Sequence, residues 1–129
     1  MTIPLLLAIA SGGALGALSR HGLSSLIARL SEGSAFPLGI LICNVLGSFL
    51  MGVLIATLAL KGQASEQMRA FLSVGFLGAF TTFSTFSLET VTLIERGAYT
   101  QAGLYIVASV AFSVLFLFAG MALTKGVLS

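Results

Sequence analysis

The chain has 129 residues, of which 57% are hydrophobic and only 8% are charged, and its mean hydropathy is +1.11. A soluble single domain is not this apolar, so the composition predicts a small integral membrane protein with a few spans. Six Lys or Arg residues stand singly against four Glu, without the clustered basic surface that nucleic acid requires. Paired carboxylates, His or Cys clusters and phosphate-binding loops are absent from the sequence, so an enzyme is not expected.

Four apolar segments separated by short polar breaks predict a single all-α membrane domain over residues 1–129. Each segment meets the length of roughly 20 residues that a bilayer core requires. The first has no preceding basic region and is too long for a signal-peptide core, so we expect it to remain as a span. The predicted spans cover about residues 3–30, 36–60, 66–96 and 100–124.

The first span carries small residues and one charge. Gly12 and Gly16 have the small-xxx-small spacing that lets helices approach closely in lipid, which indicates helix packing. Arg20 falls at or near the membrane boundary, where an ionised guanidinium must pair, face water or snorkel to headgroups. Two interpretations of Arg20 stand: it serves an anion vestibule or an interhelical anchor, or it simply snorkels. His21 is expected at the interface rather than in a proton relay.

The second span has one amide, Asn44, on a face that three-and-four spacing shares with Gly47, Ser48 and Met51. A mid-membrane amide can serve as interhelical glue worth about 1 kcal/mol. Its two N–H donors equally suit a small anion, since a line of donors in a pore replaces lost hydration. Both interpretations remain open from this helix alone. The lone Cys43, in an apolar run, is expected to be a structural hydrophobe.

The third span is the most unusual, because residues 75–87 combine glycines with five hydroxyls and four phenylalanines. Irregular, hydroxyl-rich backbone at membrane depth is tolerated only where protein or a water-filled cavity surrounds it. Gly75 and Gly78, just before two threonines, indicate an unwound turn whose freed carbonyls could hold a cation. The segment therefore predicts a helix interrupted around residues 75–85 and a site for an ion or solute.

Aromatic rings and hydroxyls follow those glycines. Phe80, Phe83 and Phe86 recur every three residues, which is expected to keep their rings loosely on one side. The edges of aromatic rings are positive, so ring edges and hydroxyl donors together could bind an anion. Such a site has no full positive charge, which would bind the anion too tightly to release it. In the alternative, the rings face lipid and the hydroxyls bond back along the helix. The hydroxyls belong to Thr81, Thr82, Ser84, Thr85 and Ser87.

The fourth span presents one stripe of aromatic and hydroxyl side chains. The stripe is expected to face the third span or an ion path, although packing alone would also explain it. Its members are Tyr105, Ser109, Phe112, Ser113 and Phe116. Glu89, one turn beyond Phe86 in the third span, is predicted either at a pore mouth or as a hydrogen-bond acceptor.

Loop charges predict how copies of the chain insert. Five Lys or Arg residues lie near span ends, three on the side of both termini and two opposite: Lys61, Arg69 and Lys125 against Arg29 and Arg96. Because orientation follows this bias, a near-tie between short loops predicts insertion both ways up. Dual insertion permits an antiparallel homodimer with inverted halves. A dimer is also favoured because four helices are few to enclose a polar path. A single orientation set by the residual bias is the alternative.

Three segments resemble the Fluc (CrcB) family of microbial fluoride channels, and the resemblance covers essentially the whole chain. They are residues 12–20, 44–52 and 75–87. The resemblance implies a dual-topology antiparallel homodimer in the inner membrane of a bacterium, with two fluoride pores and a structural sodium ion at its centre. It implies passive efflux that protects the cell from fluoride, which enters as hydrofluoric acid and dissociates at the higher internal pH.

The resemblance also implies roles for individual residues. Backbone carbonyls of Gly78 and Thr81 from both subunits would hold the sodium ion. Ring edges of Phe83 and Phe86 would line the fluoride path, and Asn44 would donate to fluoride. The expected fluoride pathway comprises Arg20 near the aqueous vestibule, Asn44, Thr82, Phe83, Ser84, Phe86, Tyr105, Ser109 and Ser113.

The chain departs from the family pattern at two positions. Ile40 stands where relatives often have threonine, so no hydroxyl is expected there. Ala79 stands where a second glycine is common, which limits how closely backbones approach near the cation.

Two alternative functions compete with a fluoride channel. A proton-coupled exporter of the small multidrug resistance type also has four short spans, but it needs an ionisable carboxylate in the membrane, for which only Glu89 qualifies. A non-transporting, holin-like assembly protein would use the glycines and hydroxyls for packing alone.

Overall fold

The computed structural model describes residues 1–129 and is entirely helical. Four helices are long and apolar enough to cross a membrane, which confirms the predicted all-α class with four spans. Three spans are single helices: α1 (Ile3–Leu30), α2 (Leu38–Lys61) and α6 (Tyr99–Leu128). The third span consists of α3 (Glu66–Ala70), the π-helical η1 (Phe71–Leu77), α4 (Gly78–Phe80) and α5 (Phe83–Glu95).

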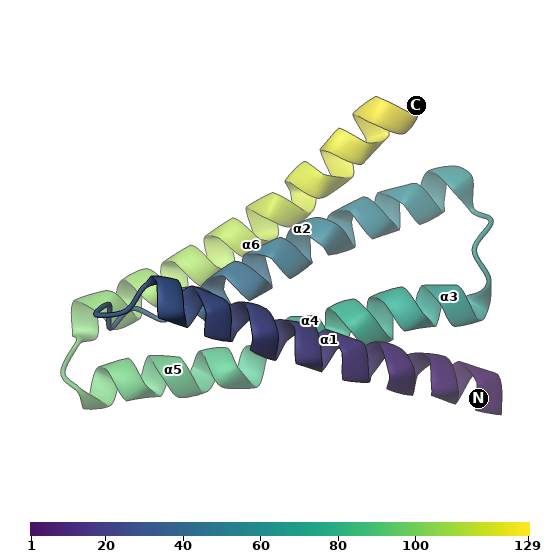
Figure 1. The fold of residues 1–129 in the computed structure, drawn as a ribbon. Coiled ribbons are helices and arrows are strands. Elements are labelled where there is room, and N and C mark those ends of the chain that lie inside the picture. Colours follow the sequence, from purple (N-terminus) through teal and green to yellow (C-terminus); the bar gives the residue numbers. More distant parts are fainter.

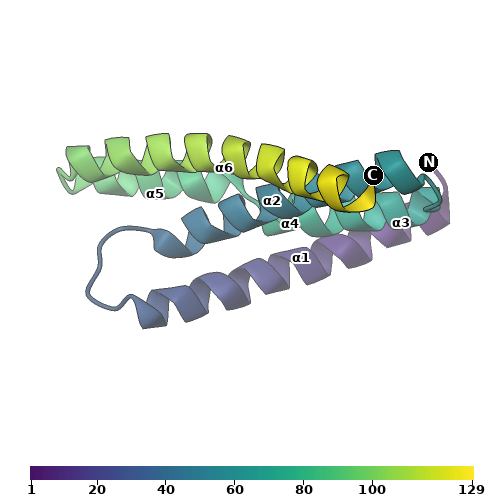
Figure 2. The ribbon, with the colours of Figure 1, turned by 90° about the horizontal axis from the view of Figure 1, so that it is seen from above.

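Both termini and the α2–α3 connection lie at one end of the molecule, and the other two connections lie at the opposite end (Figure 1). Seen from above, α2 lies between α1 and α6, which occupy opposite sides (Figure 2). The first half of the third span packs on α1, whereas α5 packs on α6. The break in the third span therefore lets its two halves follow different neighbours.

Glycines bring helix backbones together at two contacts, one between α1 and η1 and one between α2 and α6. A Cβ added to Gly12 would lie 3.0 Å from the Phe76 nitrogen and 3.2 Å from the Gly75 Cα, so α1 and η1 touch backbone to backbone. Gly52 and Gly120 have the same function between α2 and α6. Small residues permit such close approach in lipid, where dispersion contacts rather than water exclusion hold helices together. The packing predicted from Gly12 and Gly16 therefore occurs within one chain.

The third span is broken at Thr81 and Thr82, which confirms the predicted interruption. Both residues have extended backbone, with φ −89° and ψ 152° at Thr81 and φ −151° and ψ 125° at Thr82. Thr82 also caps the next helix, because its hydroxyl accepts a hydrogen bond from the Thr85 N–H at 3.2 Å. Gly75 and Gly78 themselves remain helical, so the unwound residues are the two threonines.

Candidate functional site

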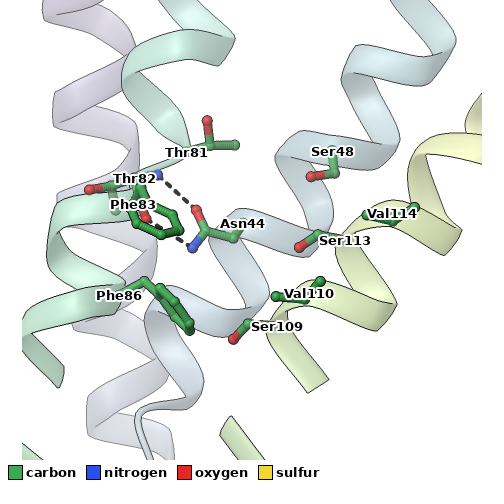
Figure 3. A pocket seen from close by; sticks show the side chains of 10 residues that line it. All are labelled: Asn44, Ser48, Thr81, Thr82, Phe83, Phe86, Ser109, Val110, Ser113 and Val114. Carbon is green, nitrogen blue, oxygen red and sulfur yellow. Dashed lines mark hydrogen bonds between the residues drawn. The ribbon is translucent and has the colours of Figure 1, made fainter. Parts of the chain in front are cut away.

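A cavity of about 330 Å³ lies where α2, α6 and the break of the third span meet (Figure 3). An amide, hydroxyls and two phenylalanine rings make up most of its wall, and no ionisable side chain belongs to it. The lining residues are Asn44, Ser48, Thr81, Thr82, Phe83, Phe86, Ser109, Val110, Ser113 and Val114. Three of the residues expected on the pathway, Arg20, Ser84 and Tyr105, lie outside this wall.

Asn44 bridges to the break through two hydrogen bonds. Its Nδ2 donates to the Thr82 carbonyl at 3.1 Å, and its Oδ1 accepts from the Thr82 N–H at 2.8 Å. The carboxamide thus replaces the helical partners that Thr82 loses in the extended conformation. Because Nδ2 carries two hydrogens, one remains for another acceptor in the cavity. The two interpretations left open for this amide, interhelical glue and anion donor, are therefore compatible.

Two carbonyls at the break lose their helical donors. The N–H that would bond to Gly78 O belongs to Thr82 and donates instead to Asn44. The N–H four residues beyond Thr81 belongs to Thr85 and donates instead to the Thr82 hydroxyl. The carbonyls of Gly78 and Thr81 are therefore both released from the helical pattern, and Gly78 is exposed on the surface of the single chain.

Arg20 anchors α1 to the first half of the broken helix. One of its terminal guanidinium nitrogens donates to the Ala79 carbonyl at 2.7 Å. A cation at the carboxyl end of a helix satisfies a free carbonyl and complements the helix dipole. Of the interpretations considered for Arg20, the interhelical anchor matches this contact.

The phenylalanine rings divide into two groups. Phe83 and Phe86 both line the cavity, with ring centroids 5.5 Å apart and planes inclined by 47°. Phe86 is 9% exposed, whereas Phe83 is 77% exposed in the single chain. Phe80 instead stacks on Phe76 on the other side of the break, at 6.1 Å and 7°.

The expectation that Phe80, Phe83 and Phe86 share one side is therefore wrong. Spacing by three residues keeps side chains together only along a continuous helix. The two extended threonines change the direction of the chain between Phe80 and Phe83, so the helical phase is not carried across them.

The stripe on α6 also divides. Ser109 and Ser113 line the cavity, whereas Phe112 and Phe116 belong to a separate apolar hollow against α2. Ser109 is 6% exposed, and its hydroxyl has no hydrogen-bond partner in the chain. The serines and the phenylalanines of the stripe therefore face two different spaces.

Tyr105 joins the cavity wall to Glu89, the only carboxylate of the spans that does not stand at a span end. It is fully buried, its ring lies 5.2 Å from that of Phe86, and its hydroxyl donates to Glu89 at 2.8 Å. Glu89 is thus the hydrogen-bond acceptor that was one of its two predicted roles. Ile40 packs in the same apolar cluster as Phe86 and Tyr105, so a hydrophobic side chain fits that position. Tyr105 therefore packs against Phe86 on the side away from the cavity.

Ser84 lies on the outer side of the break. It is exposed, and its hydroxyl lies 3.4 Å from that of Thr82. The cavity instead gains Ser48, which spacing had already placed on the Asn44 face, together with Val110 and Val114, which carry no sequence signal of a site.

Comparison with known proteins identifies the family. The family model described as "CrcB-like protein, Camphor Resistance (CrcB)" matches residues 7–121. Three similar proteins are each named fluoride-specific ion channel FluC. That of Chelativorans sp. (strain BNC1) is 48% identical over 123 residues, covering 95% of this chain and 98% of the relative. That of Caulobacter sp. (strain K31) is 48% identical over 125 residues, with 96% and 97% covered, and that of Cereibacter sphaeroides (strain ATCC 17029 / ATH 2.4.9) is 50% identical over 121 residues, with 94% of each covered.

These matches extend over all four spans and include the three motifs of the resemblance. With bacterial relatives and four helices able to cross a membrane, the protein is a multi-pass protein of the bacterial inner membrane. The chain belongs to the CrcB family.

Proposed function

We propose that this protein is a fluoride-selective channel through which fluoride leaves the cell passively. The observation that carries the proposal is the cavity at the helix break, whose wall combines an amide, hydroxyls and aromatic rings without any charged side chain. The relatives named fluoride-specific ion channels indicate the substrate. Because the relatives are named as channels, the proposed function is conduction.

The cavity chemistry suits a small, strongly hydrated anion. Such an ion needs several donors in place of its lost water, and the second Asn44 hydrogen and the unpartnered Ser109 hydroxyl are available donors. The edges of Phe83 and Phe86 add weak positive potential without a net charge. A full cation at this point would bind the anion too strongly for rapid passage.

A homodimer accounts for the exposed side of the break. Irregular backbone at membrane depth is tolerated only where protein or a water-filled cavity covers it. Gly78 is exposed in the single chain, and so is most of the Phe83 ring. A second copy inserted the other way up would cover this surface, in agreement with the nearly balanced loop charges. Each copy would contribute one cavity, giving two fluoride pathways per dimer.

A sodium ion fits the two carbonyls released by the break. Unwound backbone carbonyls in membrane proteins coordinate sodium, and Gly78 O and Thr81 O lack their helical donors. No group of three or more His, Cys, Asp or Glu side chains is placed to hold a metal, and the released backbone carbonyls offer oxygen ligands. The ion would be structural, shared between two copies at the dimer centre, and not transported.

Proton-coupled export is the second candidate, since Glu89 is a carboxylate inside a span. Its hydrogen bond with Tyr105 gives it a structural partner, and it does not line the cavity. A coupling carboxylate must release and rebind a proton in each cycle. Export of this kind predicts transport that depends on a proton gradient and is lost in a Glu89→Gln variant.

Reconstitution in liposomes tests the proposal. Vesicles loaded with fluoride or with chloride are diluted into ion-poor buffer, and anion efflux is followed after a potassium ionophore is added. We expect rapid fluoride release, negligible chloride release and no dependence on a proton gradient. Fluoride retention by vesicles that contain folded protein would refute the channel and direct attention to Glu89.

A further inference from the structure

The polar residues of the cavity on α2 and α6 form two pairs. Asn44 and Ser48 are four residues apart on α2, and Ser109 and Ser113 are four residues apart on α6, so each pair lies on one helix face about 6 Å apart along the axis. The two helices run in the same direction (Figure 1). The donors therefore form a ladder along the cavity rather than a single ring.

Ser48 lies at the end of this ladder beyond Asn44. In Figure 3 its hydroxyl faces the same space as the hydroxyl of Ser113. Ser48 is partly buried, and no other polar group of the chain accepts its hydrogen.

Hydroxyls elsewhere on the helices, such as those of Thr57 and Thr90, bond back to their own helix. Thr57 donates to Val53 O at 2.7 Å, and Thr90 donates to Phe86 O at 2.9 Å. Such back-bonding is the ordinary way in which a helix satisfies a hydroxyl in an apolar setting. The Ser109 hydroxyl has no partner at all, and those of Ser48 and Ser113 make no hydrogen bond within the chain. Donors left free in a cavity wall are suited to a ligand that only accepts hydrogen bonds, which is an anion.

We infer that Ser48 is a further fluoride-binding residue, whose hydroxyl donates to the ion together with that of Ser113 at the end of the cavity. The inference rests on the proposed fluoride conduction and adds a residue to its path. A second level of donors lets the ion exchange one set of partners for the next without passing through a stage with none. Multi-site coordination of this kind permits both entry and release.

The test compares fluoride efflux from liposomes for the wild type and three variants. Losing a hydrogen bond to a charged partner lowers the affinity for that partner about tenfold or more. Ser48→Ala is therefore expected to lower fluoride flux at a fixed gradient about tenfold. Ser48→Thr keeps the hydroxyl and is expected to retain most of the flux. Thr57→Val is the matched control on the same helix, because its hydroxyl already bonds to Val53 O, and it should conduct like the wild type.

The outcomes separate the inference from the proposed function. A wild type that releases no fluoride refutes the channel itself. A conducting wild type with Ser48→Ala at the same flux overturns only the role of Ser48. Since the Ser48 hydroxyl makes no hydrogen bond within the chain, the thermal stability of Ser48→Ala should match that of the wild type. If Ser48→Ala instead lowers both flux and stability, and Ser48→Thr does not restore them, Ser48 has a packing role and the inference is overturned. If Ser48→Ala does not fold, Ser48→Cys replaces it in the test, because cysteine has a similar size but is a weak hydrogen-bond donor. We expect the same loss of fluoride flux in Ser48→Cys, and full flux in that variant overturns the inference.

Discussion

Replacing Asn44 by alanine removes both partners of the Thr82 peptide groups at the helix break. An unsatisfied buried backbone group costs about 1–3 kcal/mol, so losing two partners should lower the free energy of unfolding by about 2–6 kcal/mol. Membrane depth and the extended conformation leave Thr82 no helical substitute. Against a total stability of about 5–15 kcal/mol for a typical domain, this loss would be large.

The assay is unfolding in mixed micelles with increasing dodecyl sulfate, followed by helical circular dichroism. Protein concentration is held constant, because dimerisation makes apparent stability depend on it. Ser48→Ala is the matched control one turn along the same face, and it should change stability by no more than about 0.5 kcal/mol because it removes no bond within the chain. Asn44→Asp keeps an acceptor for the Thr82 N–H but not the donor to its carbonyl, and its stability should lie below the wild type.

The stabilising role of the two Asn44–Thr82 hydrogen bonds would be refuted if Asn44→Ala unfolded at the same dodecyl sulfate fraction as Ser48→Ala. Such a result would mean that Thr82 finds other partners at no cost. Asn44 would then act on fluoride alone, and the variant would lose flux without losing stability.

Three further predictions follow from the contacts around the break. Gly75→Ala should destabilise the protein by about 1–3 kcal/mol, because the new Cβ would lie 2.8 Å from Ile9 O, whereas Gly22→Ala, with open space around it, should cost nothing in the same unfolding assay. Arg20→Met should lose about 1–3 kcal/mol by leaving the Ala79 carbonyl unpartnered; unchanged stability with reduced flux would instead favour a vestibule role for Arg20. Replacing sodium by N-methylglucamine during prolonged dialysis should lower the thermal midpoint of the dimer, and an equal midpoint in both buffers would contradict the sodium site.

The buried ring of Phe86 offers a separate test of conduction. Phe86→Leu should reduce fluoride flux roughly tenfold while the protein still folds, because leucine has no positive ring edge. A non-transporting assembly protein would tolerate this change, so equal flux in the variant would argue against a role for the ring in the path.

The sequence alone was sufficient to predict four spans, because span length and hydropathy are properties of contiguous residues. It also located the break, since threonines and serines following glycines at membrane depth demand a polar surrounding. The glycines of α1 were correctly assigned to packing, because small residues have few other uses on an apolar helix.

Only the tertiary structure decided what pairs with the break. Asn44 and Thr82 are 38 residues apart and Arg20 and Ala79 are 59 residues apart, and no periodicity relates positions on different helices. The placement of Phe80 away from Phe83 had the same origin, since two extended residues end the helical phase on which face assignments depend. Sequence patterns describe one helix at a time, whereas hydrogen bonds at a break are set by whichever neighbouring helices bring a donor or acceptor to the freed backbone.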